Sequence, residues 1–442
     1  MARKILLSGL VLLLALGLAA CGPPATEAPA PPTEEPGVEE VEVGPISLRL
    51  WTHQNPTFNE GYEALIAAYQ EAHPNVEITL ETFEYDTYIQ TLATAMPAGE
   101  EADIIQLFGT WTAEYAERLA PVPEDVMTVA EAEALYYAAP IGGFIVDGVL
   151  YGLPQEFNIE YGGVLVNKTM FEEAGLTYPP EWETIDDVLE DALALVQYDE
   201  AGVMTVSGFH FASSDAAVFS FLAGILQRGG DYWNADRTGF TFNTPEARAQ
   251  LQWMVDAIEM GVSDPVLFED AENWVGDAFF EGRVAIGYIG PWAISMGLYD
   301  FPDFEYEWDY LTLPPIQGDP LFAADSGWGL VVSPNSAHQD VAWDFVKFVA
   351  ANPDNAAQWN ITSSTLPAIP EVAESDAVLE AMPWVARELE QLPYGRHLGS
   401  MPDRDLVMYE ILYPHILNVL QGVETVDEAL EMIDAEANAT FE

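Results

Sequence analysis

The chain has 442 residues, of which 50% are apolar and 12% aromatic, so it is not intrinsically disordered and is long enough for two large domains or three ordinary ones. It carries 73 Asp and Glu residues against 13 Lys and Arg, a net charge of −60. Charge of that sign repels phosphate backbones and anionic lipid headgroups, so we do not expect nucleic-acid binding. The single cysteine excludes an internal disulfide and a thiolate metal site.

The first forty-five residues are typical of an exported lipoprotein. Two basic residues precede an apolar run from Ile5 to Ala20, which is short for a membrane span and right for a signal peptide. The small residues before Cys21 resemble a bacterial lipobox, which implies cleavage of the signal peptide 1–20 and lipidation of the cysteine thiol. A free cysteine after an ordinary signal peptide is the alternative. Residues 21–45 are then expected to form a disordered Pro/Glu-rich tether, extended because proline stiffens it and its glutamates repel one another.

After the tether, strand and helix patterns alternate. Apolar and polar residues alternate over 47–51, and a helix with apolar residues at helical spacing follows and ends at Pro74. A second strand over 76–80, a second helix over 88–96 and a buried strand over 103–108 come next. This βαβαβ order predicts a mainly parallel sheet with helices on both faces and a ligand crevice at the carboxyl ends of the strands.

Helix boundaries are well marked further along the chain. Thr244 and Pro245 are typical of an N-cap and a first helical residue, and Gly261 of a helix end. Another helix follows Ser336, and Thr425 opens a capping box at the start of the last helix. About 400 ordered residues exceed what one core usually holds, so we expect an α/β protein with two lobes.

Several segments, in the right order, resemble the extracellular solute-binding proteins of ABC importers, in the carbohydrate-binding group typified by maltose-binding protein. The resemblance covers almost everything from residue 46 to 442, although Val166 stands where the family usually has tyrosine. The segments are Leu48–His53, Glu100–Ile105, Tyr151–Pro154, Glu160–Lys168, Phe171–Trp182, Phe280–Ala293 and Asp325–Phe348.

The resemblance implies a two-lobed periplasmic-binding-protein fold of type II, whose lobes are discontinuous in sequence and joined by a hinge. The N-terminal lobe is expected at 46–155 plus 313–365, and the C-terminal lobe at 159–310 plus 370–442. Crossing segments then fall near Gln155–Ile159, Leu311–Pro315 and Thr365–Pro370. A few residues in such crossings absorb the backbone change when the lobes close.

A sugar site needs aromatic rings for the apolar sugar faces and polar groups for the hydroxyl edges. By the resemblance, Trp292 matches the stacking ring of a Gly-Pro-Trp segment, and Glu160 matches a carboxylate that accepts sugar hydroxyls after the first crossing. The resemblance also implies ligand contacts from loops that line the cleft, at Trp51, His53, Asn55, Trp111, Ser326, Trp328 and Arg404.

Several of these candidates have a purely structural alternative. Trp292 can be a core residue, Glu160 a solvated carboxylate, and Trp51 a cap on the sheet. His53 can be a hydrogen-bonded loop residue. The sequence has no catalytic motif, zinc-binding histidine pair or EF-hand loop, so we expect no enzyme activity, cofactor or metal.

We therefore expect a lipid-anchored solute-binding protein that captures a mono- or oligosaccharide between two lobes and delivers it to the permease and ATPase subunits of an ABC importer. It would be a monomer in the periplasm or on the outer face of the cell membrane. The same fold can instead take a polyamine, a peptide or a glycerophosphodiester. A tethered glycoside hydrolase is the alternative from another class, because the chain offers many carboxylate pairs.

Overall fold

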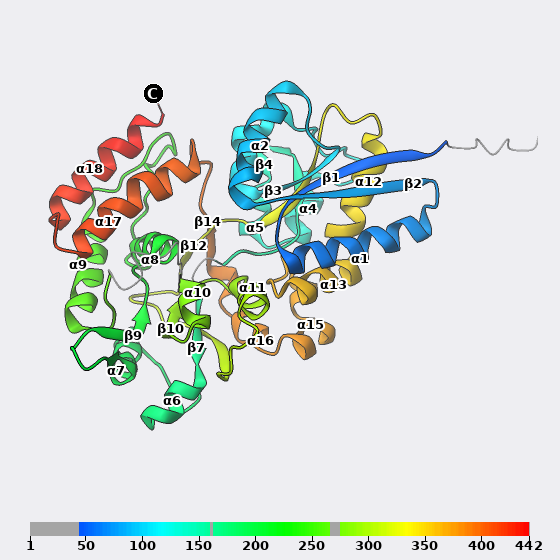
Figure 1. Cartoon of the computed structure of the whole chain (residues 1–442). Helices are drawn as coiled ribbons and strands as arrows, with labels where there is room; N and C mark the ends of the chain where they lie inside the picture. The colour runs from blue at the N-terminus through cyan, green and yellow to red at the C-terminus, as the bar shows by residue number, and fades with distance from the viewer. Residues whose placement is uncertain (1–43, 160–161, 266–274, 442) are drawn as a thin grey trace, which may run out of the picture. The chain divides into compact units, whose positions relative to one another are not determined.

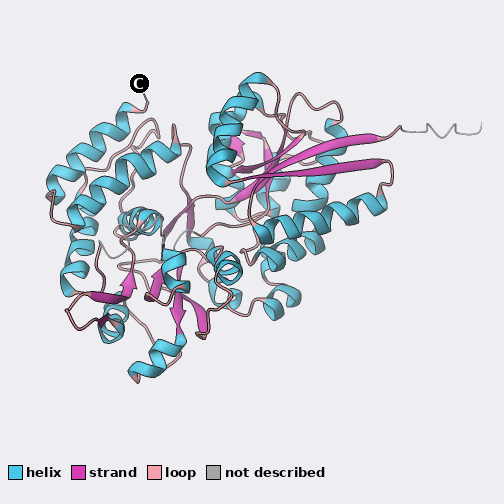
Figure 2. Cartoon of the chain, viewed as in Figure 1, coloured by secondary structure: helices cyan, strands magenta, loops and turns pink. Residues whose placement is uncertain are grey.

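The computed structural model describes residues 44–159, 162–265 and 275–441, and from Pro45 onward these residues form one compact unit. The strands gather mainly in two five-stranded sheets, which Figure 2 shows in magenta. The predicted signal peptide, Cys21, almost all of the tether and Glu160 lie outside the described residues. None of the helices built from the described part of the chain combines the length and apolar character that a membrane span needs.

The first sheet has the strand order β2-β1-β3-β13-β6. β1 pairs in parallel with β2 and β3, whereas β13 runs antiparallel between β3 and β6. The predicted βαβαβ order is therefore confirmed, and β13 begins at the edge where the three parallel strands end. The strands are β1 (Ile46–His53), β2 (Val76–Phe83), β3 (Ile104–Phe108), β6 (Gly152–Pro154) and β13 (Trp328–Val332).

The second sheet has the order β11-β7-β10-β9-β8, in which β9 and β10 are parallel and the other neighbours antiparallel. Its strands are β7 (Gly163–Asn167), β8 (Gln197–Tyr198), β9 (Met204–His210), β10 (Val284–Tyr288) and β11 (Trp308–Thr312). Two small pairs are β4 (Ile145–Val146) with β5 (Val149–Leu150), and β12 (Phe322–Ala324) with β14 (Gly395–His397).

Helices cover the first sheet because each buries one apolar stripe. In α1 the stripe contains Phe58, Tyr62, Leu65 and Tyr69 at helical spacing, and α13 lies beside α1 (Figure 1). α2 packs on β1 and β2, and α12 packs on β13. The longer helices here are α1 (Pro56–Ala72), α2 (Tyr85–Ala98), α12 (Gln339–Ala350) and α13 (Pro353–Ser363). The shorter ones are η1 (Gly109–Trp111), α3 (Thr112–Tyr115), η2 (Ala116–Arg118), α4 (Val129–Leu135) and α5 (Ala138–Gly142). After α13 come α14 (Pro370–Ala373), α15 (Asp376–Ala381), α16 (Val385–Glu388) and η3 (Leu392–Tyr394), of which α16 packs on β11 of the second sheet.

A second set of helices packs on the second sheet and around α8. α8 is buried along most of its length, with Phe219 and Phe221 inside the core, because α9, α17 and β12 all contact it. The predicted caps are confirmed, since Thr244 accepts a hydrogen bond from the third helical residue and Thr425 forms a capping box. Gly261 ends α9 in the left-handed region. These helices are α6 (Lys168–Ala174), α7 (Ile185–Leu195), α8 (Ser214–Gln227), α9 (Pro245–Met260), α10 (Val275–Phe280), α11 (Ala293–Asp300), the π-helical η4 (Leu406–Leu412), α17 (Tyr413–Leu420) and α18 (Val426–Ala439).

Two of the predicted crossing segments lie side by side. Glu156 and Pro367 form an antiparallel bridge between them. The side-chain amide of Asn360 donates to the carbonyl of Gln155 at 3.1 Å and to the hydroxyl of Thr365 at 3.0 Å, so α13 is tied to both segments. The lobe boundaries themselves stay a prediction.

Candidate functional site

Aromatic rings gather where the parallel strands of the first sheet end. His53 and Phe108 end β1 and β3, Tyr85 opens α2 just after β2, and Trp328 opens the antiparallel strand β13 at the same edge. Trp111, in η1, completes this aromatic cluster. The loops at the carboxyl ends of parallel strands are where an α/β sheet places its ligands, so the cluster occupies the position expected of a binding site.

Trp328 is the centre of the aromatic cluster. Its ring stacks on His53 at 4.5 Å between centroids and meets Phe108 edge-on at 4.9 Å. Trp111 and Tyr85 lie nearly perpendicular to it, at 5.5 and 6.4 Å. Four of the five residues are buried, whereas Tyr85 is 43% exposed and so presents the cluster to solvent.

His53 contributes to this surface as an uncharged ring. Burial lowers its pKa to about 4, although the hydrogen bond between its Nδ1 and Oε1 of Gln106, at 2.9 Å, opposes the shift. The ring is therefore neutral at neutral pH. Its stacking on Trp328 makes it part of the aromatic wall rather than a source of positive charge.

A chain of polar side chains lies against the aromatic cluster and connects the two sheets; we call it the polar chain. The hydroxyl of Thr110, in η1, donates to Asp325 at 2.9 Å, and the guanidinium of Arg404 pairs with both oxygens of the same carboxylate. Arg404 also donates to the hydroxyl of Tyr409 at 2.9 Å, and that hydroxyl donates to Asp215 at the start of α8. Loops from both halves of the fold thus meet through one network.

Arg404 belongs to the polar chain and also contacts the aromatic cluster. It is buried, and its guanidinium carbon lies 5.7 Å from the ring centre of Phe108 and 5.0 Å from that of Tyr409. Burial acts to lower the pKa of Arg404. The negative charge of Asp325 and smaller contributions from neighbouring groups together outweigh burial, so the pKa lies well above its ordinary value. Arg404 is therefore a permanent cation held in place by carboxylates.

Three other predicted site residues have structural partners. The indole nitrogen of Trp51 donates to Glu81 on the neighbouring strand at 2.6 Å, which fits the alternative that it caps the sheet. The side-chain oxygen of Asn55 accepts from the first backbone N–H groups of α1 and so acts as its N-cap. Ser326 is completely buried, and its hydroxyl donates to the carbonyl of Pro140 at 2.6 Å.

Trp292 lies at the corresponding edge of the second sheet. It precedes α11, just after β10, and packs against Gly290, where any added Cβ would collide with the indole. The hydroxyls of Thr57 in α1 and Ser295 in α11 lie 3.1 Å apart, and Thr57 also donates to Asn55. The loops that carry Asn55 and Trp292 are therefore close together, as a site between two lobes requires.

Six residues of this site were not among the candidates predicted from the sequence, and two of them, Phe108 and Thr110, are close neighbours of the predicted Trp111. Tyr85 had a usable signal, because it follows the second parallel strand as His53 ends the first. Asp325 lies beside the predicted Ser326, and Asp215 lies in the first turn of α8, the helix that follows β9. Tyr409 had no local signal, since only tertiary packing brings it to Asp215, 194 residues earlier in the chain.

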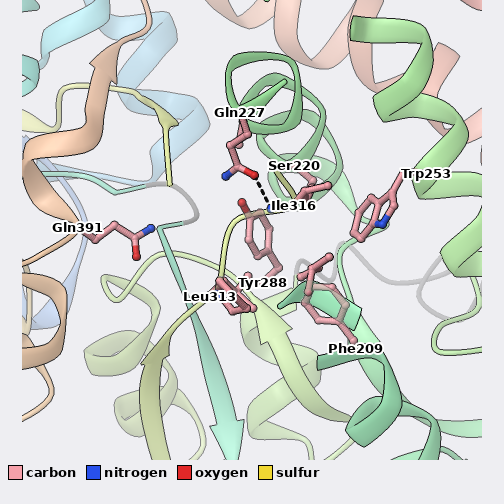
Figure 3. Close-up of a pocket in the computed structure, with 11 residues that line it drawn as sticks. Phe209, Ser220, Gln227, Trp253, Tyr288, Leu313, Ile316 and Gln391 are labelled. Carbon is pink, nitrogen blue, oxygen red and sulfur yellow. Dashed lines mark hydrogen bonds between the residues drawn. The ribbon is translucent and has the colours of Figure 1, made fainter. Parts of the chain in front are cut away.

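A small cavity lies beside the second sheet (Figure 3). Its volume is about 30 Å³, which is room for roughly two water molecules and too little for a sugar ring. One wall is closed by a hydrogen bond of 2.7 Å from the backbone of Ile316 to Gln227. The lining residues are Ile185, Phe209, Ser220, Ala223, Gln227, Trp253, Tyr288, Leu313, Pro314, Ile316 and Gln391.

Metal binding has no support in the part of the chain that the structure describes. Within residues 44–159, 162–265 and 275–441, no group of three His, Cys, Asp or Glu side chains is arranged to hold an ion. The carboxylates of the polar chain are spread along it and are each engaged by a hydrogen bond from Thr110, Arg404 or Tyr409.

Two α/β sheets wrapped by helices, with aromatic and polar loops meeting between them, define the two-lobed fold of type II solute-binding proteins. The family model "Bacterial extracellular solute-binding protein" matches residues 55–356, more than half of the chain, and the chain belongs to this family. The family and the fold predicted from the sequence are thus confirmed.

Individual relatives are distant in sequence. The maltotriose-binding protein of Pyrococcus abyssi is 24% identical over 381 residues, which cover 82% of this chain and 76% of the relative. Among solved structures, a cyclic α-maltosyl-1,6-maltose binding protein from Arthrobacter globiformis has a TM-score of 0.74 at 23% identity, covering 90% of this chain and 99% of its own. An ABC transporter solute-binding protein from Thermotoga lettingae, bound with α-D-tagatose, has a TM-score of 0.75 at 22% identity, with 90% and 100% covered. All three are binding proteins rather than enzymes.

Proposed function

We propose that this protein captures a saccharide between its two lobes, at the aromatic cluster and the polar chain, and delivers it to an ABC importer. The observation that carries the proposal is the half-exposed ring of Tyr85 backed by Trp111 and Trp328, because aromatic faces suit the apolar faces of a sugar. The polar chain beside them offers groups for sugar hydroxyls. The saccharides in the names of the three relatives described above support the same ligand class.

Closure of the two lobes would couple binding to delivery. The polar chain begins at Thr110 near the first sheet and ends at Asp215 near the second. A ligand that touches both sides gains contacts in the closed form that it lacks in the open one, so binding shifts the population toward closure. The closed form would then be the one that docks on the permease.

The N-terminal segment would hold the protein at the membrane. A cysteine preceded by small residues, after an apolar run, supports cleavage and lipidation at Cys21. We therefore place the mature protein, as a monomer, outside the cytoplasm on a lipid anchor. Replacing Cys21 by serine is expected to release the protein from the membrane fraction without changing ligand binding.

A melting screen of the purified protein against mono- and oligosaccharides tests the binding function. A bound sugar at 100 times its Kd stabilises the folded state by about 2.7 kcal/mol and raises the melting temperature. We expect this shift to disappear in Trp328→Ala and in Tyr85→Ala, the second of which removes an exposed ring and leaves the buried ones in place. Trp182→Ala, which removes a half-buried indole hydrogen-bonded to Asp191, is the matched control and should keep the shift.

Two results would contradict the proposal. One is the absence of a shift with every saccharide, and the other is unchanged binding in Tyr85→Ala and Trp328→Ala. Product analysis of the same mixtures separates binding from hydrolysis, because a glycoside hydrolase would release shorter sugars whereas a binding protein leaves them intact.

A further inference from the structure

The small cavity beside the second sheet lies at the edge where the two parallel strands of that sheet end. Tyr288 is the last residue of β10, Phe209 is the last but one of β9, and both line the cavity. Trp292 follows β10 at the same edge. Because α/β sheets place their ligands at the carboxyl ends of parallel strands, the cavity lies where the proposed sugar site would extend onto the second sheet.

Helix α8 connects the cavity to the polar chain. Asp215, the last residue of the polar chain, lies in the first turn of α8, and Ser220, which lines the cavity, comes five residues later. An α-helix rises about 1.5 Å per residue, so the two residues are separated by about 7.5 Å along its axis. One sugar ring with an exocyclic group spans this distance.

The cavity is also close to the loop that carries Trp292. A Cβ added at Gly290 would collide with the indole of Trp292 and would lie 2.9 Å from the carbonyl oxygen of Ile159. A Cβ added at Gly162 would lie 3.3 Å from the side chain of Ile159 and 2.9 Å from Nε2 of Gln391, which lines the cavity. Gln391 and Trp292 are therefore both within reach of the same backbone segment.

Gln391 brings to the cavity a polar atom without a partner. The side chain is only 5% exposed, and its Oε1 has no hydrogen-bond partner among the described residues, although buried polar atoms normally have one. Figure 3 shows the amide end of Gln391 directed toward the other labelled residues of the cavity. An amide oxygen only accepts hydrogen bonds, so the group that satisfies it must carry an O–H or an N–H.

The other glutamine amide that lines the cavity is already engaged. Oε1 of Gln227 accepts from the backbone N–H of Ile316 at 2.7 Å, and its Nε2 donates to the carbonyl of Leu321 at 3.0 Å. An occupant is therefore directed toward Oε1 of Gln391.

The size and the walls of the cavity restrict the occupant further. The volume of about 30 Å³ is room for roughly two water molecules, and so for a group of about two non-hydrogen atoms. Apolar side chains, among them Ile185, Phe209 and Leu313, form much of the wall and suit a carbon atom. One carbon that carries one hydroxyl meets both requirements, whereas an acetamido or phosphate group is too large.

We propose that the cavity receives the exocyclic hydroxymethyl group of a hexose unit of the ligand, whose hydroxyl donates a hydrogen bond to Oε1 of Gln391. This inference rests on the proposed function and narrows the ligand to saccharides built from hexoses with this group unmodified. A pentose in its six-membered ring form lacks the whole group, and a 6-deoxy sugar lacks the donor. A uronic acid presents a carboxylate, which has no hydrogen to donate at neutral pH.

Calorimetric titration of the purified protein with matched pairs of sugars tests the inference. The pairs are D-glucose with D-xylose, D-galactose with L-arabinose, D-mannose with D-lyxose, and cellotriose with xylotriose. The members of a pair differ only in the hydroxymethyl groups. In the pair that binds most tightly, we expect the hexose to bind at least about tenfold more tightly than its counterpart, because the pentose leaves the cavity unfilled and Gln391 unpaired. The 6-deoxy form of that hexose should have an intermediate affinity.

Two substitutions test whether the cavity is the cause of this preference. Gln391→Met keeps the length of the side chain but removes the acceptor, and Ala223→Val adds two methyl groups to the wall formed by α8. Each should lower the affinity for the hexose several-fold and leave that for the pentose within about twofold. Gln197→Met, at an exposed position on the edge strand β8 of the same sheet, is the matched control and should change neither affinity.

The outcomes that overturn the inference differ from those that overturn the proposed function. Equal binding within every pair refutes the hydroxymethyl site and leaves sugar binding standing. A hexose preference of undiminished size in both Gln391→Met and Ala223→Val also refutes it, because the group is then recognised elsewhere. If neither variant folds, the 6-deoxy sugar decides with the unmodified protein, since binding as tight as that of the hexose excludes the hydrogen bond to Gln391. Failure of every saccharide to bind refutes the proposed function as well.

Discussion

Replacing Glu156 by glutamine should remove a pH-dependent loss of stability. Glu156 lies in the first predicted crossing and is 1% exposed. Its Oε1 accepts a hydrogen bond from the backbone of Trp328 at 3.1 Å, and its Oε2 has no hydrogen-bond partner among the described residues. Burial raises the pKa of Glu156 to about 8, although the hydrogen bond from Trp328 acts in the opposite direction.

Proton linkage gives the sign and the size of the change in the free energy of unfolding with pH. The ordinary glutamate pKa is 4.5, so between that pH and about 8 the folded protein holds a proton on Glu156 that the unfolded chain releases. The free energy of unfolding therefore falls as pH rises, by up to about 1.4 kcal/mol per pH unit, or roughly 4 kcal/mol from pH 5 to pH 8. Glutamine is uncharged and keeps an oxygen for Trp328, so Glu156→Gln should lack this loss. Glu388, another buried carboxyl with a pKa of about 8, is present in both proteins and cancels in the difference.

Urea unfolding followed by tryptophan fluorescence and circular dichroism, at intervals from pH 5 to pH 8.5, measures the effect. The advantage of Glu156→Gln over the unmodified protein should grow steadily up to pH 8 and then level off. Glu77→Gln, at an exposed position on β2, is the control and should give a nearly constant difference. If Glu156→Gln and the unmodified protein lose stability in parallel across this range, the buried carboxyl is ionised in the folded state and the reasoning is wrong.

Three further changes act on features described above. Arg404→Met leaves the carboxylate of Asp325 buried without its cation, and urea unfolding should show a loss of about 3–5 kcal/mol that a second change, Asp325→Asn, partly restores. Gly208→Ala places a Cβ against the carbonyl oxygen of Ala192, so calorimetry should show a lower melting temperature and a loss of about 1–3 kcal/mol or more; an unchanged value would mean that α7 moves away freely. Thr425→Ala removes the N-cap of α18 and should cost about 1 kcal/mol in urea unfolding, with Thr425→Ser as a near-neutral comparison.

The sequence was most informative where structure is determined locally. The alternation of apolar residues in β1 and the apolar spacing in α1 predicted both elements, because each depends on residues a few positions apart. The caps at Thr244 and Thr425 were equally local, since each involves a side chain and a backbone group three residues on. The strand β13 was beyond this reasoning, because its antiparallel insertion between β3 and β6 depends on pairing with residues 175 to 228 positions earlier in the chain.

In the candidate site, too, locally determined features could be predicted and long-range contacts could not. Trp328, Trp111 and His53 were predicted and do meet in one cluster, because strand order alone places the ends of β1 and β3 together. Trp51 was predicted from the same strand, but its indole pairs with Glu81, a contact set by the register of two strands. The polar chain could not be predicted, since every link except that between Arg404 and Tyr409 joins residues 79 to 215 positions apart.

The bridge between Glu156 and Pro367 has a mechanical consequence. Two antiparallel segments joined by hydrogen bonds form a narrow ribbon, which bends more easily across its plane than within it. Asn360 of α13 donates hydrogen bonds to both segments, so the ribbon is held against α13. Under the proposed function, opening and closing would then follow a single path, so that the surfaces of the two lobes would return to the same relative position each time.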